Sequence, residues 1–307
     1  MRTLVLTIII LLCGFITGYN QEKSNNSKSI NNLYVNQNPP GEIPEVFAPG
    51  IISTDAYEFG GSFSPDGKEF YFTRRPTYEG SDNRIFNTYL ANSKWTKPQV
   101  ASFAQDLFEF EPSVSPDGQR LYFYSERRGD RKSDYDGDLW YLDRNSEDPT
   151  VAKFFESPIN KKYVMMLSSS MSGTLFFAGM FNGKRGIFQS KKSANGYQQI
   201  EYLPEEINSI NSAHPFIAPD ESYIIFDSQV TGMGKPELYI SFKKDDGSWT
   251  RAVNMGPEIN STKTEFAAFV SPDGKYLFFS RRINGNGDIF WVDSKIIQDL
   301  KLEELKE

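Results

Sequence analysis

Three glutamates and three arginine pairs occupy matching places along this chain. Glu58, Glu109 and Glu265 each precede a turn of the type Ser-Pro-Asp-Gly by six residues, and an arginine pair follows each turn. The pairs are Arg74-Arg75, Arg127-Arg128 and Arg281-Arg282. Arginine forks grip carboxylates, sulfates or phosphates in two-point contacts, and glutamate accepts hydrogen bonds from sugar hydroxyls. We therefore expect a ligand site built from the three glutamates together with Arg75, Arg128 and Arg282.

A structural interpretation competes with this one. Each glutamate could instead pair with an arginine of its own or a neighbouring repeat, and so brace the ends of two strands. A pairing at equivalent positions is what a repeat duplicates, whereas ligand sites usually break the symmetry.

His214 is the one histidine of the chain, and it stands two residues after Ser212, which replaces the repeated glutamate. It is a candidate ligand-binding residue and a candidate general acid or base, although a single histidine is commonly hydrogen-bonded structure. There is no Gly-x-Ser-x-Gly elbow, and one histidine cannot build a histidine-rich metal site. Carboxylates at 134–138 could wrap a calcium ion, but the loop lacks the full spacing, so a plain turn is favoured. No cofactor and no metal are expected.

These residues are carried by a repeated β-hairpin. Short runs rich in aromatic and β-branched residues flank five turns, and Pro-Asp-Gly supplies the turn chemistry in three of them. The turns begin at Ser64, Ser115, Ser170, Ala218 and Ser271, spaced 51, 55, 48 and 53 residues apart. A third strand follows each hairpin. A polar turn and a fourth strand come next in the repeats before the last, as expected at 92–96 and 246–250. A period near fifty residues with four strands per repeat predicts a β-propeller.

The ends of the chain decide the number of blades. The last repeat lacks a fourth strand, and the segment 42–47 is expected to supply it by pairing with the strand at 288–292. This closure would leave no open sheet edge. We predict an all-β fold, a five-bladed propeller over residues 42–294, with a six-bladed ring as the alternative, and a C-terminal helical tail at 295–307.

The turns also carry a family resemblance. Four of the five keep Pro-Asp after Ser or Ala, with aromatic-rich strands on both sides, and this resembles the TolB-like Pro-Asp propeller repeat of exported bacterial proteins. The third turn, Ser170-Met171-Ser172-Gly173, departs from the pattern. The resemblance implies a propeller over most of the chain. It leaves the function open, because such propellers include binding scaffolds, accessory domains of peptidases and some lyases.

The N-terminal region predicts export. Residues 1–18 have the layout of a signal peptide, and residues 19–41 are polar enough to form a disordered tether. Cys13, the one cysteine, lies in a loose match to a lipobox and is a candidate for a lipid anchor. We expect a periplasmic or outer-membrane-associated protein, and the net charge of −7 argues against nucleic-acid binding.

Two functional hypotheses follow. The first is a non-enzymatic protein that binds an envelope polypeptide or glycan through the charged mouth of its central channel. The alternative is a carbohydrate-active hydrolase or lyase in which two of Glu58, Glu109 and Glu265 act as acid and base. Two of these carboxylates within about 5 to 10 Å of each other in an open pocket, with no arginine neutralising them, would favour the enzyme. A salt bridge at each glutamate would count against the enzyme.

Overall fold

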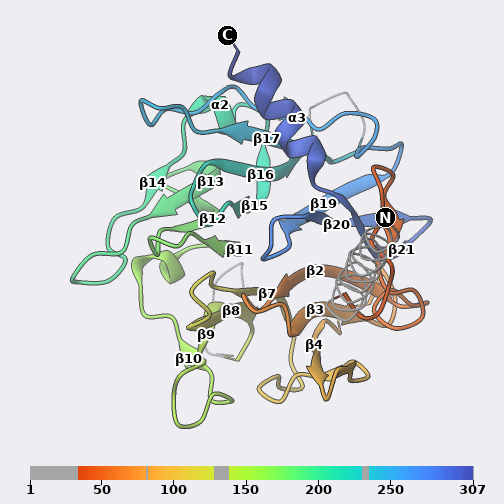
Figure 1. Cartoon of the computed structure of the whole chain (residues 1–307). Coiled ribbons are helices and arrows are strands. Elements are labelled where there is room, and N and C mark those ends of the chain that lie inside the picture. Colours follow the sequence, from red (N-terminus) through yellow and green to blue (C-terminus); the bar gives the residue numbers. More distant parts are fainter. Residues whose placement is uncertain (1–33, 81, 128–137, 230–234, 307) are drawn as a thin grey trace, which may run out of the picture.

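The computed structural model describes residues 34–80, 82–127, 138–229 and 235–306 of the chain. Five antiparallel sheets surround one axis, and the first strand of each lies innermost (Figure 1). The first three blades are β2 (Tyr57–Phe63), β3 (Glu69–Arg75), β4 (Arg84–Ala91) and β6 (Gln99–Val100); β7 (Glu109–Val114), β8 (Arg120–Ser125), β9 (Asp138–Asp143) and β10 (Lys153–Phe154); and β11 (Val164–Ser169), β12 (Leu175–Phe181), β13 (Lys184–Ser190) and β14 (Glu201–Tyr202). The last two are β15 (Ser212–Ile217), β16 (Tyr223–Ser228), β17 (Glu237–Phe242) and β18 (Val253–Asn254); and β19 (Thr264–Val270), β20 (Tyr276–Ile283), β21 (Asn286–Asp293) and β1 (Glu45–Val46). The predicted five-bladed propeller is confirmed.

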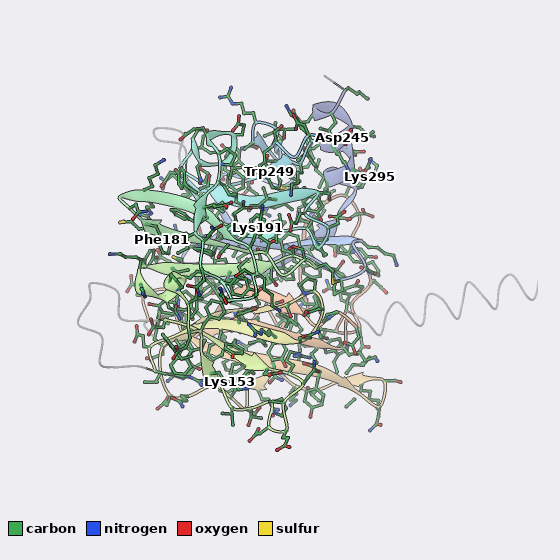
Figure 2. All side chains as sticks on the ribbon, turned by 90° about the vertical axis from the view of Figure 1, so that its left-hand side faces the viewer. Lys153, Phe181, Lys191, Asp245, Trp249 and Lys295 are labelled. Atoms are coloured by element: carbon green, nitrogen blue, oxygen red, sulfur yellow. The ribbon has the colours of Figure 1, made fainter. Side chains whose placement is uncertain are left out.

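The two faces of this disc differ in the loops they carry. One face, here called the mouth end, holds the connectors into the innermost strands and the loops between second and third strands. The other face, the turn end, holds the five hairpin turns. Figure 2 shows the disc from the side, with Phe181, the last residue of β12, at the mouth end and Lys295, just after β21, toward the turn end.

The ring closes as the sequence predicts. In β1, Glu45 pairs with Trp291 and Val46 with Phe290 of β21. Phe47 follows with its side chain fully buried, and its ring lies 5.2 Å from Trp291 and 5.5 Å from Phe70 of the first blade. The N-terminal segment therefore joins the last blade to the first.

The outer parts of the blades differ from the expectation. In the first blade, β5 (Lys94–Trp95) extends a hairpin from β4, and the outer edge strand is β6. In the fourth blade, the outer strand is β18, and the expected segment at 246–250 forms a turn. The observed edge strands in the blades are only two residues long, so they carry little periodic signal in the sequence.

Both termini of the propeller are packed against it. Tyr34 and Val35 are buried between the last and first blades, which corrects the end of the predicted tether; the rest of it up to residue 33, and the signal peptide with Cys13, lie outside the described residues. Helix α3 (Lys295–Glu304) lies where the helical tail is expected, on the outside of the last blades (Figure 1). Two short turns of helix, η1 (Pro158–Lys161) and α2 (Glu205–Asn208), lie in connectors. In the part of the chain that the structure covers, none of the helices has the length and apolar character needed to span a bilayer.

Candidate functional site

The three predicted glutamates are structural braces in this fold. The side chains of Glu58, Glu109 and Glu265 have no exposed surface, and each carboxylate binds the first arginine of the pair in its own blade. The Nε to Oε1 distances are 2.7 Å to Arg74, 2.7 Å to Arg127 and 2.8 Å to Arg281. The same arginines also donate to backbone carbonyls of the connector that leads into the innermost strand. The carboxylates therefore fasten connectors to strands and offer no surface to a ligand.

The second arginine of each pair has a different environment. Arg75 lies over the ring of Tyr57 at 4.3 Å, and Arg282 lies over the ring of Tyr78 at 4.7 Å and hydrogen-bonds its hydroxyl. Neither arginine forms a salt bridge with any residue that the structure describes, and the buried Nε of Arg75 has no hydrogen-bond acceptor. Arg128 lies outside the described residues. Arg75 and Arg282 thus place two guanidinium groups beside Tyr78 at the mouth end, and neither has a carboxylate partner among the described residues.

His214 lies inside the channel between two buried carboxylates. Its Nδ1 is 2.8 Å from Oδ1 of Asp227, and its Nε2 is 3.4 Å from Oε1 of Glu111. The side chain of His214 is 18% exposed, whereas those of Glu111 and Asp227 are 2% and 6% exposed. The contact to Asp227 is a hydrogen bond, but the contact to Glu111 is longer than an ordinary hydrogen bond. Nε2 is therefore the ring nitrogen that a ligand oxygen could reach.

A bulge in each innermost strand determines where the side chains of Glu111 and His214 lie. The register of every first strand shifts at the same point, four residues before its hairpin turn, and the residue there has a positive φ. The five residues are Gly60, Glu111, Met166, His214 and Ala267. A bulge redirects a side chain out of the sheet's regular alternation. The fold repeats the bulge in all blades, but only two blades place an ionisable group on it.

Backbone contacts fix the two carboxylates in place. Oε2 of Glu111 accepts a hydrogen bond of 2.8 Å from the amide of Met166, and Oδ1 of Asp227 accepts one of 3.2 Å from the amide of Ala267. In two other blades the bulge amide donates to a neutral hydroxyl, that of Thr73 or of Ser280. In Glu111, one carboxylate oxygen accepts from the backbone and the other faces His214. In Asp227, the same oxygen makes both contacts.

Electrostatics favour the protonated form of His214. Burial alone lowers the pKa of an imidazole, but the adjacent carboxylates of Asp227 and Glu111 outweigh it and hold the pKa of His214 well above its ordinary value. The protonated ring can give up its Nε2 proton to a base that approaches, which is the property of a general acid.

A cluster of buried aromatic residues lies between His214 and the arginines. The rings of His214 and Phe266 are 5.8 Å apart, those of Phe266 and Phe59 are 6.1 Å apart, and Arg75 lies 5.8 Å from the ring of Phe59. Phe110 and Tyr124 belong to the same cluster on the side of the second blade. These rings pack on one another and connect His214 with Arg75.

The sequence pointed to His214, Arg75 and Arg282 but missed Glu111 and Asp227. A signal for Glu111 exists, because Glu111 and His214 both stand four residues before the first residue of their turns. Asp227 has a weaker signal of the same kind, because it stands nine residues after the first residue of its turn, as Thr73 and Ser280 do. The loop at 134–138, where a plain turn was favoured over a calcium site, lies outside the described residues up to residue 137, and no group of three potential ligands suitable for a metal occurs among the described residues.

Comparisons with known proteins give a fold-level likeness and no family. No family model matches the chain, and no curated protein matches it. Among solved structures, an endo-arabinase from Bacteroides thetaiotaomicron is 15% identical, with 83% of this chain and 96% of that chain covered and a TM-score of 0.48. A gluconolactonase from Xanthomonas campestris is 11% identical, with 82% and 95% covered and a TM-score of 0.48. An oligogalacturonate lyase from Vibrio parahaemolyticus is 12% identical, with 78% of each chain covered and a TM-score of 0.42.

The salt bridges correct the first functional hypothesis, a non-enzymatic envelope protein that binds its partner through a charged mouth. The carboxylates that were to form this mouth are buried and paired with arginines of their own blades. The same salt bridges also remove the paired glutamates from the enzymatic alternative. Among the described residues, the group around His214 is the candidate for acid or base chemistry that is left.

Proposed function

We propose that this protein is a carbohydrate-active enzyme, a hydrolase or a lyase, with His214 as its general acid. The observation that carries the proposal is the position of His214 on an innermost strand, where its two ring nitrogens face the buried carboxylates of Asp227 and Glu111. Such a group does not follow from the propeller repeat, because three of the five bulge positions carry Gly, Met and Ala.

Each member of the cluster has a separate role. Asp227 is a positioning residue, because its hydrogen bond to Nδ1 fixes the orientation of the ring and directs Nε2 into the channel. His214 protonates the leaving oxygen of the bond that breaks. Glu111, 3.4 Å from Nε2, is the nearest proton acceptor, and it takes a proton from water in a hydrolase or from a sugar carbon in a lyase.

The mouth end supports an acidic sugar as the substrate. Arg75 and Arg282 lack carboxylate partners among the described residues, and a guanidinium binds a carboxylate by two parallel hydrogen bonds. The buried aromatic cluster of Tyr57, Phe59, Phe110 and Tyr124 lies between these arginines and His214. In this proposal the two guanidinium groups hold the carboxylate of the sugar at the rim, and the glycosidic oxygen has to pass this cluster to reach the histidine.

Activity on a panel of oligosaccharides tests the proposal. We expect turnover of acidic oligosaccharides such as oligogalacturonides, and much weaker turnover of neutral arabino-oligosaccharides. New reducing ends without ultraviolet absorbance indicate a hydrolase, whereas an absorbing unsaturated product indicates a lyase. His214→Asn should lower kcat by about 100-fold or more, the usual contribution of a general acid.

Glu111 and Glu109 provide a matched pair of variants. They lie two residues apart on β7, and both are buried, but only Glu111 contacts His214. We expect Glu111→Gln to lower kcat strongly and Glu109→Gln to lower stability while the folded fraction keeps its kcat. Equal kcat values for Glu111→Gln and the unchanged protein, or no turnover of any oligosaccharide in the panel, would contradict the proposal.

Export and the finer family resemblance remain part of the proposal. The Ser-Pro-Asp-Gly turns support a TolB-like origin, and the layout of residues 1–18 supports secretion to the periplasm or the outer membrane. Cell fractionation and the intact mass of the mature protein test both. A mass that includes a diacylglycerol on Cys13 would establish the lipid anchor, and cleavage after Gly18 would exclude it.

A further inference from the structure

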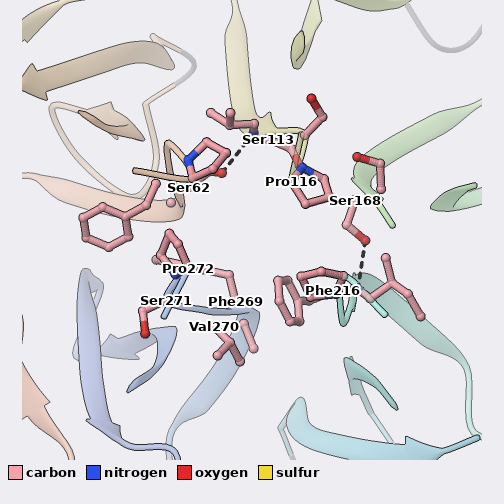
Figure 3. A pocket seen from close by; sticks show the side chains of 18 of the residues that line it. Ser62, Ser113, Pro116, Ser168, Phe216, Phe269, Val270, Ser271 and Pro272 are labelled. Carbon is pink, nitrogen blue, oxygen red and sulfur yellow. Dashed lines mark hydrogen bonds between the residues drawn. The ribbon is translucent and has the colours of Figure 1, made fainter. Parts of the chain in front are cut away.

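A cavity opens at the turn end of the channel, on the face opposite to the arginines. Its volume is about 380 Å³, and residues from the innermost strands and turns of all five blades line it. Figure 3 shows it from close by. Neither His214 nor Glu111 is among the residues that line it, so the cavity is separate from the acid and base site.

The walls of this cavity differ from one side to the other. Each blade contributes the residue two positions before the first residue of its turn, and these residues are Ser62, Ser113, Ser168, Phe216 and Phe269. The first three blades thus present hydroxyls and the last two present phenyl rings. In Figure 3 the three serines lie along the upper side, with Phe216 below them.

The serines are supported by the neighbouring blades. The hydroxyl of Ser62 accepts a hydrogen bond of 3.0 Å from the amide of Val114, and that of Ser168 accepts one of 3.1 Å from the amide of Ile217. A hydroxyl that accepts from an amide still carries its own hydrogen. The hydroxyls of Ser62 and Ser168 are therefore held in place by the neighbouring blades.

The cavity holds no charge. Its described lining contains proline, phenylalanine, serine and aliphatic residues, with one tyrosine, and no acidic or basic side chain. A charged ligand would lose its hydration there without gaining a counter-ion, which is costly. The volume exceeds the roughly 150 Å³ of an apolar cavity that accepts benzene, so a ring with substituents fits.

We propose that this cavity binds an uncharged ring compound that has an apolar face and hydroxyl groups along one edge. The face packs on Phe216 and Phe269, and the hydroxyl edge meets Ser62, Ser113 and Ser168. A phenol and a neutral sugar ring share this chemistry. The inference is independent of the proposed enzymatic function, because it uses other residues at the other face.

Ligand-detected NMR with the whole protein tests whether the cavity binds an uncharged ring compound. The probes are catechol and methyl glucoside as neutral hydroxylated rings, and benzoate as a charged ring of similar size. We expect at least one neutral ring to bind with a Kd of about 1 mM or lower, within the range of ligands of this size. Benzoate should bind at least tenfold more weakly. The tighter of the two neutral probes identifies whether the ligand is an aromatic alcohol or a sugar.

Two variants locate the binding. Ser113→Phe fills the cavity and should abolish the signal, and Phe216→Ala removes the packing face and should weaken binding at least tenfold. Ser193→Phe, at an exposed turn away from the cavity, is the control, and circular dichroism confirms the fold of each variant. Binding of benzoate as tight as that of the neutral rings, absence of binding by both neutral rings, or full binding by a folded Ser113→Phe would overturn the proposal.

Discussion

Adjacent arginines in this protein have different roles because successive side chains of a strand point to opposite faces of the sheet. Arg74 lies directly across from Glu58 in the strand register and binds its carboxylate, whereas Arg75 turns toward Tyr57. The sequence predicted both a ligand site and a brace from these pairs. The structure assigns the brace to Arg74, Arg127 and Arg281, whereas Arg75 and Arg282 have no carboxylate partner among the described residues.

A pair of substitutions separates the two roles. Arg74→Gln leaves the buried carboxylate of Glu58 without its cation, so we expect the free energy of unfolding to fall by about 3 kcal/mol or more. Arg75→Gln removes contacts with aromatic rings and a long hydrogen bond of 3.4 Å to the carbonyl of Gly80, with an expected loss of about 1 kcal/mol or less. Urea unfolding measures both. Equal losses would show that Arg75 is also a brace.

Asp288 is an acidic residue whose charged form destabilises the folded state. Partial burial, and then the charges of Glu58 and Asp55, raise its pKa to about 6. A raised carboxyl pKa means that the folded state holds the proton longer than the unfolded state, so stability falls as the pH rises from about 4 to 6. Asp288→Asn should therefore stabilise the protein at pH 7.5 by about 1 kcal/mol, allowing for solvent screening, and have little effect at pH 3.5. Thermal unfolding at both pH values measures the change, and a destabilised variant at pH 7.5 would contradict this account.

At the scale of elements, the hairpin turns show how one repeat compensates for another. In three turns a serine hydroxyl donates to the aspartate two residues later, as Ser64 does to Asp66. The third turn has Ser172 in place of that aspartate. There the hydroxyls of Ser170 and Ser172 donate to Glu221, which occupies the glycine position of the fourth turn. The glutamate of the fourth turn thus supplies the carboxylate that the third turn lacks.

Glu221 should therefore stabilise the junction of two blades. Burial alone would raise its pKa, but hydrogen bonds from Lys243, Ser172 and Ser170 lower it to about 2. A lowered carboxyl pKa gives stability that is complete above the unfolded value near 4.5 and is lost as the pH falls toward 2. Glu221→Gln should cost about 1 kcal/mol at pH 7 after allowance for screening, and almost nothing near pH 2. Urea unfolding at both pH values measures it, and a cost that does not depend on pH would count against the ionic contribution.

The sequence predicted elements better than it predicted the site. The hairpins were found because aromatic-rich strands and Pro-Asp-Gly turns are strong local signals, and the turn of the third blade was located despite its altered residues. The outer strands were misplaced because two paired residues leave no period to detect. Asp227 was missed because its meeting with His214 depends on how the bulge in β15 faces β16, which residue types alone do not encode.

At the scale of the whole molecule, stability depends on the joint between the first and last blades. Phe47 packs against rings of both blades and has no exposed surface, whereas Ile43, four residues earlier on the same segment, is 78% exposed. The closing segment thus acts mainly through one aromatic side chain and the short pairing of β1. The pairing itself was predictable, because the last repeat lacks its fourth strand.

The joint can be tested with these two side chains. Phe47→Ala should lower the free energy of unfolding by about 3 to 5 kcal/mol, as for other large buried aromatic residues. Ile43→Ala should change it by about 0.5 kcal/mol or less, because the side chain is already in solvent. Chemical unfolding of the two variants measures the difference. Similar small effects would mean that the ring is closed by other contacts.

The most direct test of the central claim is an NMR titration of His214. Because the chain has a single histidine, its imidazole resonances need no assignment among alternatives when the protein carries no histidine tag. The folded pKa is raised, so His214 stabilises the fold fully below its unfolded pKa near 6.5, and this contribution is lost as the pH rises through the folded pKa. We predict a pKa well above 6.5 that falls in Asp227→Asn and in Glu111→Gln, and a shift of the resonances when oligogalacturonide is added. A pKa at or below 6.5, or resonances that ignore both substitutions, would contradict a proton held on His214 by two carboxylates.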